Sequence, residues 1–226
     1  MVGPAAGGGR GVIMPLVKIC GITRVEDADQ AAADGADFLG LNFWPGSKRR
    51  VTPETAAPLV VAARAMSATV QLVGLFVDQS EGEITGIANA VGLDLVQLHG
   101  DEPPSLVAAL TTRGLRVWKA HAVMGPEDID GLAAWPADAH LLDAPSPGRG
   151  GSGKTFDWAL AEAAVAAGHR VVLAGGLTPA NVAEAVARVR PYAVDVASGV
   201  ESAPGVKDAA KVRAFLEAAR PSTRPR

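Results

Sequence analysis

The sequence predicts an α/β protein, a single (β/α)8 barrel with a parallel eight-stranded core. Short β-branched or apolar runs alternate with Ala-rich segments of helical period along the chain. Strands that are separated by helices pair in parallel through right-handed crossovers. Eight such units in 226 residues, 48% of them hydrophobic, suit one closed barrel better than an open doubly wound sheet or two separate domains.

The strands are predicted where a short run of β-branched or apolar residues is bounded by turn residues. In chain order they are Leu16–Gly21, Asp37–Phe43, Val70–Val77, Asp94–His99, Arg116–Ala122, His140–Asp143, Arg170–Ala174 and Ala193–Ser198.

Helices are predicted between the strands from their apolar period and from the residues at their ends. Thr52-Pro53-Glu54 and Thr178-Pro179 are typical of helix starts, and Gly35, Gly114 and Gly168 follow helix ends, where a positive φ is often required. The clearest predicted helices are Val25–Asp34, Thr55–Ala65, Pro103–Arg113, Trp158–Ala167, Ala180–Val189 and Asp208–Ala219.

The barrel domain is expected to span residues 14–220. Residues 1–13 are rich in Gly and Ala and lack the apolar core of a signal peptide, so we expect a disordered extension, with Met14 as a candidate natural start. Residues 221–226 are expected to be a flexible tail.

Charge and composition exclude several classes of partner. A net charge of -3 with scattered basic residues argues against nucleic acid, and no apolar run is long enough to span a membrane. The single cysteine, Cys20, excludes an internal disulfide and favours a reducing, cytoplasmic compartment. The Ala-rich outer helix faces carry no outstanding apolar patch, which favours a monomer and leaves a homodimer open.

Polar residues follow several predicted strands, at the end of a barrel where active sites lie. Cys20 lies at the end of the first strand, Gln97 and His99 lie at the end of the fourth, and Asp143 lies at the end of the sixth. A simpler interpretation exists for each of them: Cys20 as a small buried side chain, Asp143 as a helix cap or loop carboxylate, and His99 as a structural histidine. Together they predict one polar rim.

Residues two apart share a face of a strand, so Lys18 and Cys20 are expected to point the same way. If Lys18 faces the barrel interior, its ammonium would favour the thiolate of Cys20 and make it a competent base near neutral pH. An unpaired buried charge is costly, and Asp195 in the eighth strand is the best-placed carboxylate to pair with Lys18.

Two glycine-containing segments follow the seventh and eighth strands. In Gly175-Gly176 and Ser198-Gly199, backbone N–H groups can approach an anion without hindrance, at the position where barrels often bind phosphate. Glycines that only make tight turns are the alternative. The paired placement predicts a phosphorylated small molecule as the substrate.

A third glycine-rich segment, Gly148–Thr155, fits the G-x-x-x-x-G-K-[ST] pattern of a nucleotide-binding P-loop. Pro145 and Pro147 interrupt its approach from the sixth strand, and no obvious hydrophobic strand ending in Asp remains to hold magnesium. We therefore favour a mobile loop over the rim, with Arg149 facing solvent, over an NTPase.

Seven segments in this order resemble the phosphoribosylanthranilate isomerase family of tryptophan biosynthesis, and the resemblance extends from residue 16 to about 217. The segments are VKICGIT (17–23), GADFLGLNFWPGSKRRVTP (35–53), LVGLFVD (72–78), VQLHGDE (96–102), LLDAPSPGRGGSGKTFDW (141–158), LAGGLTPANV (173–182) and VDVASGVESAPGVKD (194–208). The P-loop-like segment is itself part of this family pattern.

The resemblance implies a TIM-barrel enzyme that performs an Amadori rearrangement without metal or organic cofactor. Asp143 matches the general acid that opens the sugar ring, Cys20 the general base that removes the C2 proton, and Arg49 the residue that holds the anthranilate carboxylate. Gly176, Ser198 and Gly199 fall on the phosphate-binding segments. Predicted substrate contacts also include Gln97, His99 and Asp195.

Three alternatives remain open at this stage. A histidine-pathway aminoaldose isomerase, or a bifunctional form, would be expected to show a twofold repeat and an aspartate after the first strand, where this chain has Cys20. A sugar-phosphate epimerase would need metal-binding His and Asp residues on several strands, and His99 alone is too few. A catalytically silent ligand-binding barrel would need to have lost the acid or the base.

Overall fold

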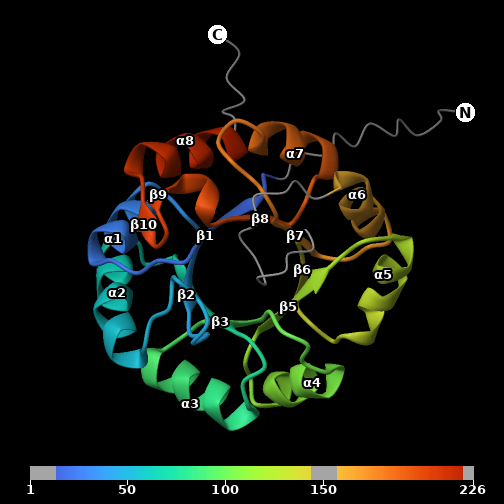
Figure 1. The fold of residues 1–226 in the computed structure, drawn as a ribbon, viewed down its shortest axis with the longest axis horizontal. Coiled ribbons are helices and arrows are strands. Elements are labelled where there is room, and N and C mark those ends of the chain that lie inside the picture. Colours follow the sequence, from blue (N-terminus) through green and yellow to red (C-terminus); the bar gives the residue numbers. More distant parts are fainter. Residues whose placement is uncertain (1–13, 144–156, 221–226) are drawn as a thin grey trace, which may run out of the picture.

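A computed structural model describes residues 14–143 and 157–220 of the chain. Within these residues eight parallel strands close into a barrel in sequential order, β1 beside β8, and the helices form an outer ring (Figure 1). The strands are β1 (Leu16–Cys20), β2 (Phe38–Asn42), β3 (Gln71–Phe76), β4 (Leu95–Leu98), β5 (Val117–Ala122), β6 (Ala139–Asp143), β7 (Val171–Leu173) and β8 (Ala193–Val196). The predicted fold class is confirmed, and the bounds of the predicted strands differ by at most two residues.

The six predicted helices are also confirmed, and two further α-helices, one of 11 residues after β3 and one of 5 residues after β5, lie between the other strands of the described ranges. The α-helices are α1 (Val25–Ala33), α2 (Pro53–Met66), α3 (Glu81–Val91), α4 (Pro104–Thr112), α5 (Pro126–Asp130), α6 (Trp158–Ala166), α7 (Val182–Val189) and α8 (Ala209–Ala219). The described part of the chain also contains two 3-10 helices, η1 (Gly131–Ala134) and η2 (Ser198–Val200).

Capping residues explain where helices begin and end. Helix α2 begins two residues before the predicted Thr55 because Thr52 and Thr55 form a reciprocal capping box at its first turn. Helix α7 begins two residues later than predicted, because Thr178 and Asn181 first form a turn in which the Thr178 N–H donates to the Asn181 side chain. Gly35, Gly114 and Gly168 all adopt positive φ after helix ends, as predicted.

Side-chain alternation along each strand separates the barrel interior from the layer beneath the helices. Val17 and Ile19 pack in the outer layer, whereas Lys18 and Cys20, which alternate with them, face the interior. The interior is filled by a second apolar cluster that includes Phe38 and Trp118, whose rings pack edge to face. The barrel is therefore a packed core that carries polar side chains at one rim.

A short antiparallel hairpin after β8 was not predicted. It consists of β9 (Glu201–Ala203) and β10 (Val206–Lys207), joined by a turn in which Gly205 has a φ of 81°. The eighth predicted strand extended to Ser198, but the chain turns at Ala197 into η2 and then into this hairpin. Figure 1 shows the hairpin beside α1 and α8, next to the end of β1.

Some predictions fall on residues outside the described ranges. These are the expected extension of residues 1–13, the tail of residues 221–226 and the P-loop-like segment Gly148–Thr155 with Arg149. In the two described ranges, no helix combines the length and the apolarity that crossing a membrane requires.

Candidate active site

Cys20 and Asp143 lie at the carboxyl ends of β1 and β6, at one rim of the barrel. Both alternate with residues of the outer layer, Ile19 and Leu142, so both side chains belong to the interior face. Strands β7 and β8 separate them along the barrel wall. Two groups capable of acid and base chemistry thus reach the same rim from different strands, as predicted.

Cys20 is buried in a small apolar layer formed with Leu75 and Val77, against which Trp44 and Ala197 pack. This burial raises the pKa of the thiol above its ordinary value, although the Lys18 ammonium acts in the opposite direction. The effect expected of Lys18 is therefore present but does not outweigh burial. The thiol is protonated over a wider pH range than the sequence argument suggested.

Gly40 makes room for the thiol and was not singled out from the sequence. It is the β2 partner of Cys20, and a Cβ atom at this position would lie 2.8 Å from Cys20 Sγ and 3.1 Å from Lys18 Cε. Its carbonyl accepts hydrogen bonds from the Gly21 and Ile22 N–H groups, which turn the chain away from the end of β1. A side chain at position 40 of β2 would displace the Cys20 sulfur from its present position.

Lys18 and Asp195 form the ion pair that the sequence predicted. They are register partners on β1 and β8, and the Lys18 Nζ lies 3.0 Å from the Asp195 Oδ1. Lys18 is fully buried. Burial alone would lower its pKa, but the charge of Asp195 and, after it, the interaction with Cys20 raise it above the ordinary value, so Lys18 remains an ammonium.

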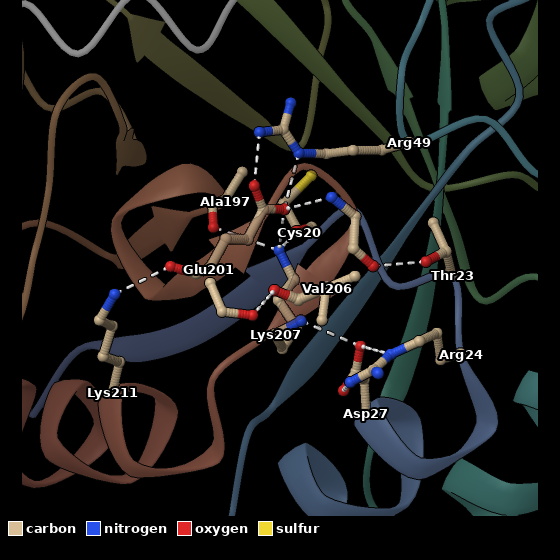
Figure 2. A network of polar contacts seen from close by, with 12 residues as sticks. Cys20, Thr23, Arg24, Asp27, Arg49, Ala197, Glu201, Val206, Lys207 and Lys211 are labelled. Atoms are coloured by element: carbon tan, nitrogen blue, oxygen red, sulfur yellow. Dashed lines mark hydrogen bonds and ion pairs between the residues drawn. The ribbon is translucent and has the colours of Figure 1, made fainter.

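Arg49 is held by a carboxylate that the sequence analysis did not identify. Its Nε and Nη2 lie 2.8 and 2.7 Å from the two carboxylate oxygens of Glu201, in a bidentate pair (Figure 2). Gly21 has a φ of 76°, and a Cβ there would lie 2.4 Å from Arg49 Cδ, so the side chain of Arg49 lies directly on the turn that follows Cys20. In Figure 2 the third guanidinium nitrogen points away from Glu201.

Gln97, His99 and Asp143 form a connected polar row. The Gln97 Nε2 lies 3.0 Å from His99 Nδ1, and the His99 Nε2 lies 3.9 Å from an Asp143 carboxylate oxygen. Gln97 is fully buried in the barrel interior, and its Oε1 has no hydrogen-bond partner among the residues that the structure describes. The structure brings these three predicted residues together.

The two predicted phosphate segments also lie side by side. Gly175 and Gly176, after β7, have φ values of 82° and 69°. Gly199, after β8, lies in the 3-10 helix η2. A Cβ on Gly199 would lie 2.0 Å from the Leu177 carbonyl oxygen, so the segments after β7 and β8 approach each other too closely for any side chain. The Asn181 Nδ2 donates to the Gly176 carbonyl and holds the first segment in its turn.

The comparisons with known proteins agree with this geometry. The family model of N-(5'phosphoribosyl)anthranilate (PRA) isomerase matches residues 17–218. The chain is 50% identical over 208 residues to N-(5'-phosphoribosyl)anthranilate isomerase of Geobacter sp. (strain M21), which covers 92% of this chain and 98% of the relative.

Solved structures show the same similarity. Phosphoribosyl anthranilate isomerase from Thermus thermophilus is 45% identical with a TM-score of 0.79, covering 90% of this chain and 97% of that one. A phosphoribosyl anthranilate isomerase in complex with reduced 1-(o-carboxyphenylamino)-1-deoxyribulose 5-phosphate is 39% identical with a TM-score of 0.81, covering 91% and 98%. This chain therefore belongs to the N-(5'-phosphoribosyl)anthranilate isomerase family.

Proposed function

We propose that this protein converts N-(5'-phosphoribosyl)anthranilate to 1-(2-carboxyphenylamino)-1-deoxyribulose 5-phosphate in tryptophan biosynthesis. The observation that carries the proposal is the convergence of Cys20 and Asp143 on one barrel rim, with the two glycine-containing segments directly after β7 and β8, the strands that lie between them. An aldose-to-ketose rearrangement needs an acid, a base and a way to hold the phosphate.

The acid step is assigned to Asp143. Its protonated carboxyl would donate to the ring oxygen of the ribose, the bond from C1 to that oxygen would break, and the anilino nitrogen would supply the electron pair that forms a Schiff base. His99, with its Nε2 at 3.9 Å, is placed to orient the carboxyl, and Gln97 is placed to orient His99.

The base step is assigned to Cys20. The thiolate would remove the C2 proton, the electron pair of that bond would form the double bond between C1 and C2, and the protonated nitrogen would become neutral. The resulting enol then tautomerises to the ketone. Lys18, paired with Asp195 beneath the thiol, supplies positive charge that stabilises the thiolate during this step.

The remaining proposed contacts orient the substrate. We assign the anthranilate carboxylate to Arg49, whose guanidinium presents a second edge away from Glu201 (Figure 2). We assign the phosphate to Gly175, Gly176, Ser198 and Gly199. Asp195 is paired with the fully buried Lys18, which supports a role beneath the substrate rather than along its length.

The test is steady-state turnover of freshly generated phosphoribosylanthranilate, followed by the loss of anthranilate-type fluorescence. Cys20→Ser and Asp143→Asn are each expected to reduce turnover by about three orders of magnitude or more, which is about 4 kcal/mol of transition-state stabilisation. Asp130→Asn, an exposed carboxylate on α5, is the matched control and should retain wild-type turnover.

Two outcomes would contradict the proposal. Wild-type protein that is folded but inactive would exclude this substrate, and the histidine-pathway aminoaldose would be the next compound to assay. Normal turnover by either Cys20→Ser or Asp143→Asn would exclude that residue as a catalytic group.

The cytoplasmic location and the monomeric state remain predictions. A base that acts as a thiolate must stay reduced, which supports a reducing compartment for Cys20. Light scattering coupled to gel filtration distinguishes a monomer from a homodimer.

A further inference from the structure

Lys207 joins the ends of two barrel strands to the hairpin that follows β8. Its Nζ lies 2.6 Å from the Cys20 carbonyl oxygen, 3.2 Å from the Ala197 carbonyl oxygen and 2.9 Å from the Glu201 Oε1. Three acceptors use the three N–H donors of an ammonium, which a neutral amine could not supply. Burial lowers the pKa of Lys207, while Glu201 acts in the opposite direction. The side chain is buried, so this geometry is fixed by packing as well as by hydrogen bonds.

Glu201 connects Lys207 to Arg49. The Oε1 accepts from both the Lys207 Nζ and the Arg49 Nε, and the Oε2 accepts from the Arg49 Nη2 (Figure 2). Burial opposes the ionisation of Glu201, but Arg49 and Lys207 hold its pKa below the ordinary value. One carboxylate therefore lies between two cations, and the three side chains together carry one net positive charge.

The hairpin that carries Glu201 and Lys207 is itself anchored at several points. The backbone N–H of Lys207 donates to the Asp27 carboxylate on α1, and the Thr23 hydroxyl donates to the Gly205 carbonyl at the turn. On the other side, the Lys211 Nζ lies 2.9 Å from the Glu201 carbonyl oxygen. Figure 2 shows these contacts spreading from the hairpin to β1, α1 and α8. A two-stranded hairpin of this size needs such tertiary contacts to be stable.

We propose that the β9–β10 hairpin is a positioning element for catalysis, in which Lys207 fixes the end of β1 that carries Cys20 and Glu201 fixes the guanidinium of Arg49. This inference rests on the proposed function, in which Cys20 and Arg49 act on the sugar and on the anthranilate carboxylate of one substrate. Their separation must then match that molecule, and a small displacement of either group costs rate. The contacts from Cys20 through Lys207 and Glu201 to Arg49 set that separation.

The same contacts place charge where the reaction needs it. The Lys207 ammonium donates a hydrogen bond to the carbonyl oxygen of Cys20, and its positive charge favours the thiolate form of that residue. The net positive charge of the group formed by Arg49, Glu201 and Lys207 favours an approaching carboxylate. Glu201 does not cancel the charge of Arg49, because it is shared with Lys207.

The first test is the pH dependence of Cys20 alkylation by iodoacetamide, which needs no substrate and reports on one thiol because the chain has one cysteine. Lys207→Met should raise the midpoint of the alkylation profile by about one pH unit, equivalent to about a tenfold loss of thiolate below the midpoint. Lys207→Arg restores the charge and should bring the midpoint back toward wild type.

Lys211→Met is the matched control for this measurement. It removes another lysine that binds the same hairpin, but its Nζ contacts the Glu201 backbone rather than the end of β1. The midpoint should stay at the wild-type value in this variant. A midpoint in Lys207→Met equal to that in Lys211→Met would overturn the role of Lys207.

The second test separates binding from chemistry with Glu201→Gln, which keeps the shape of the side chain and removes its charge. If Glu201 positions Arg49, KM should rise about tenfold with a smaller change in kcat, and adding Glu201→Gln to Arg49→Met should change KM no further. If Glu201 only neutralises charge, its loss would leave KM unchanged or lower it. That result would overturn the positioning role.

The two tests also separate this inference from the proposed function. If wild-type protein does not turn over phosphoribosylanthranilate, the alkylation profiles still decide whether Lys207 controls Cys20. If Lys207→Met does not fold, as judged by circular dichroism, Glu201→Gln replaces it, because an unpaired Lys207 ammonium should lower the alkylation midpoint. An unshifted midpoint in folded Glu201→Gln protein would then overturn the inference.

Discussion

Lys18 on β1 and Asp195 on β8 are register partners, and their side chains form an ion pair of 3.0 Å inside the barrel, directly beneath the Cys20 thiol. The pair closes the seam between the first and last strands and also places a cation beside the proposed base. Because Lys18 is fully buried, the pair exists only while both charges are present.

Asp195→Asn is expected to destabilise the protein by about 3–5 kcal/mol, because it leaves an uncompensated buried ammonium. The alkylation midpoint of Cys20 should fall in the same variant, since the thiolate then becomes the nearest anion to Lys18. Urea unfolding and iodoacetamide kinetics measure the two effects. An unchanged thiol titration would contradict the coupling of Asp195 to Cys20.

The double variant Lys18→Met/Asp195→Leu separates stability from chemistry. Two apolar side chains in place of a buried ion pair are often neutral for stability, so the unfolding free energy should recover to within about 1–2 kcal/mol of wild type. Turnover should stay low, because the Lys18 ammonium beneath the thiol is lost, even though Lys207 remains at the Cys20 carbonyl. Recovery of both properties would show that Lys18 has no part in catalysis.

Gly40→Ala is expected to lower both stability and turnover. The added methyl group would overlap the Cys20 sulfur and backbone, at a cost of about 1–3 kcal/mol for overpacking. Gly86→Ala is the matched control, since Gly86 lies exposed within α3 with open space around it. The unfolding free energy of this variant should rise by about 0.5–1 kcal/mol, with turnover unchanged. Thermal unfolding with the fluorescence assay measures both. Full activity in Gly40→Ala would show that the thiol tolerates displacement.

Gly199→Ala tests the phosphate segments. A methyl group here would overlap the Leu177 carbonyl oxygen and push the segments after β7 and β8 apart, so KM for the phosphorylated substrate and the inhibition constant for inorganic phosphate should both rise about tenfold or more. Gly131→Ala has open space around its Cβ position and should leave both constants unchanged. Equal constants in the two variants would remove Gly199 from the phosphate site.

Acid should destabilise the fold through two histidines outside the active site. The His121 Nε2 lies 3.1 Å from His140 Nδ1 between β5 and β6, and the His121 ring packs edge to face on Trp135. Burial, followed by the charge of neighbouring groups, lowers the pKa of His121 to about 3 and that of His140 to about 4. Both side chains are therefore neutral in the folded protein at pH 5–7.

The sign of the pH effect follows from the unfolded chain, in which histidine titrates near 6.5. Between that pH and the folded pKa values the unfolded state binds more protons, so the unfolding free energy falls as pH falls, by up to about 1.4 kcal/mol per pH unit for each histidine. Urea unfolding from pH 7 to pH 4 measures the slope. The double variant His121→Gln/His140→Gln should flatten this slope, whereas His169→Gln should keep most of it. Equal slopes in wild type, the double variant and His169→Gln would exclude the His121–His140 pair as the cause.

Local information in the sequence determined most of the fold and the chemistry of the rim. The alternation of strands with helices predicted the barrel, and the two-residue period of strands placed Lys18, Cys20 and Asp195 on one face. These inferences succeeded because strand direction, side-chain alternation and helix capping depend on residues near each other in the chain.

The tertiary structure alone decided what surrounds the reactive groups. Glu201 is 152 residues from Arg49, and the Lys207 ammonium is 187 residues from the Cys20 carbonyl that it binds, so no local pattern connects them. The net rise in the pKa of Cys20 has the same origin, because burial by Leu75 and Val77 from a different strand segment outweighs the nearby Lys18. Closure of the barrel brings distant segments to one rim, and the desolvation and charge pairing that result are properties of that closure.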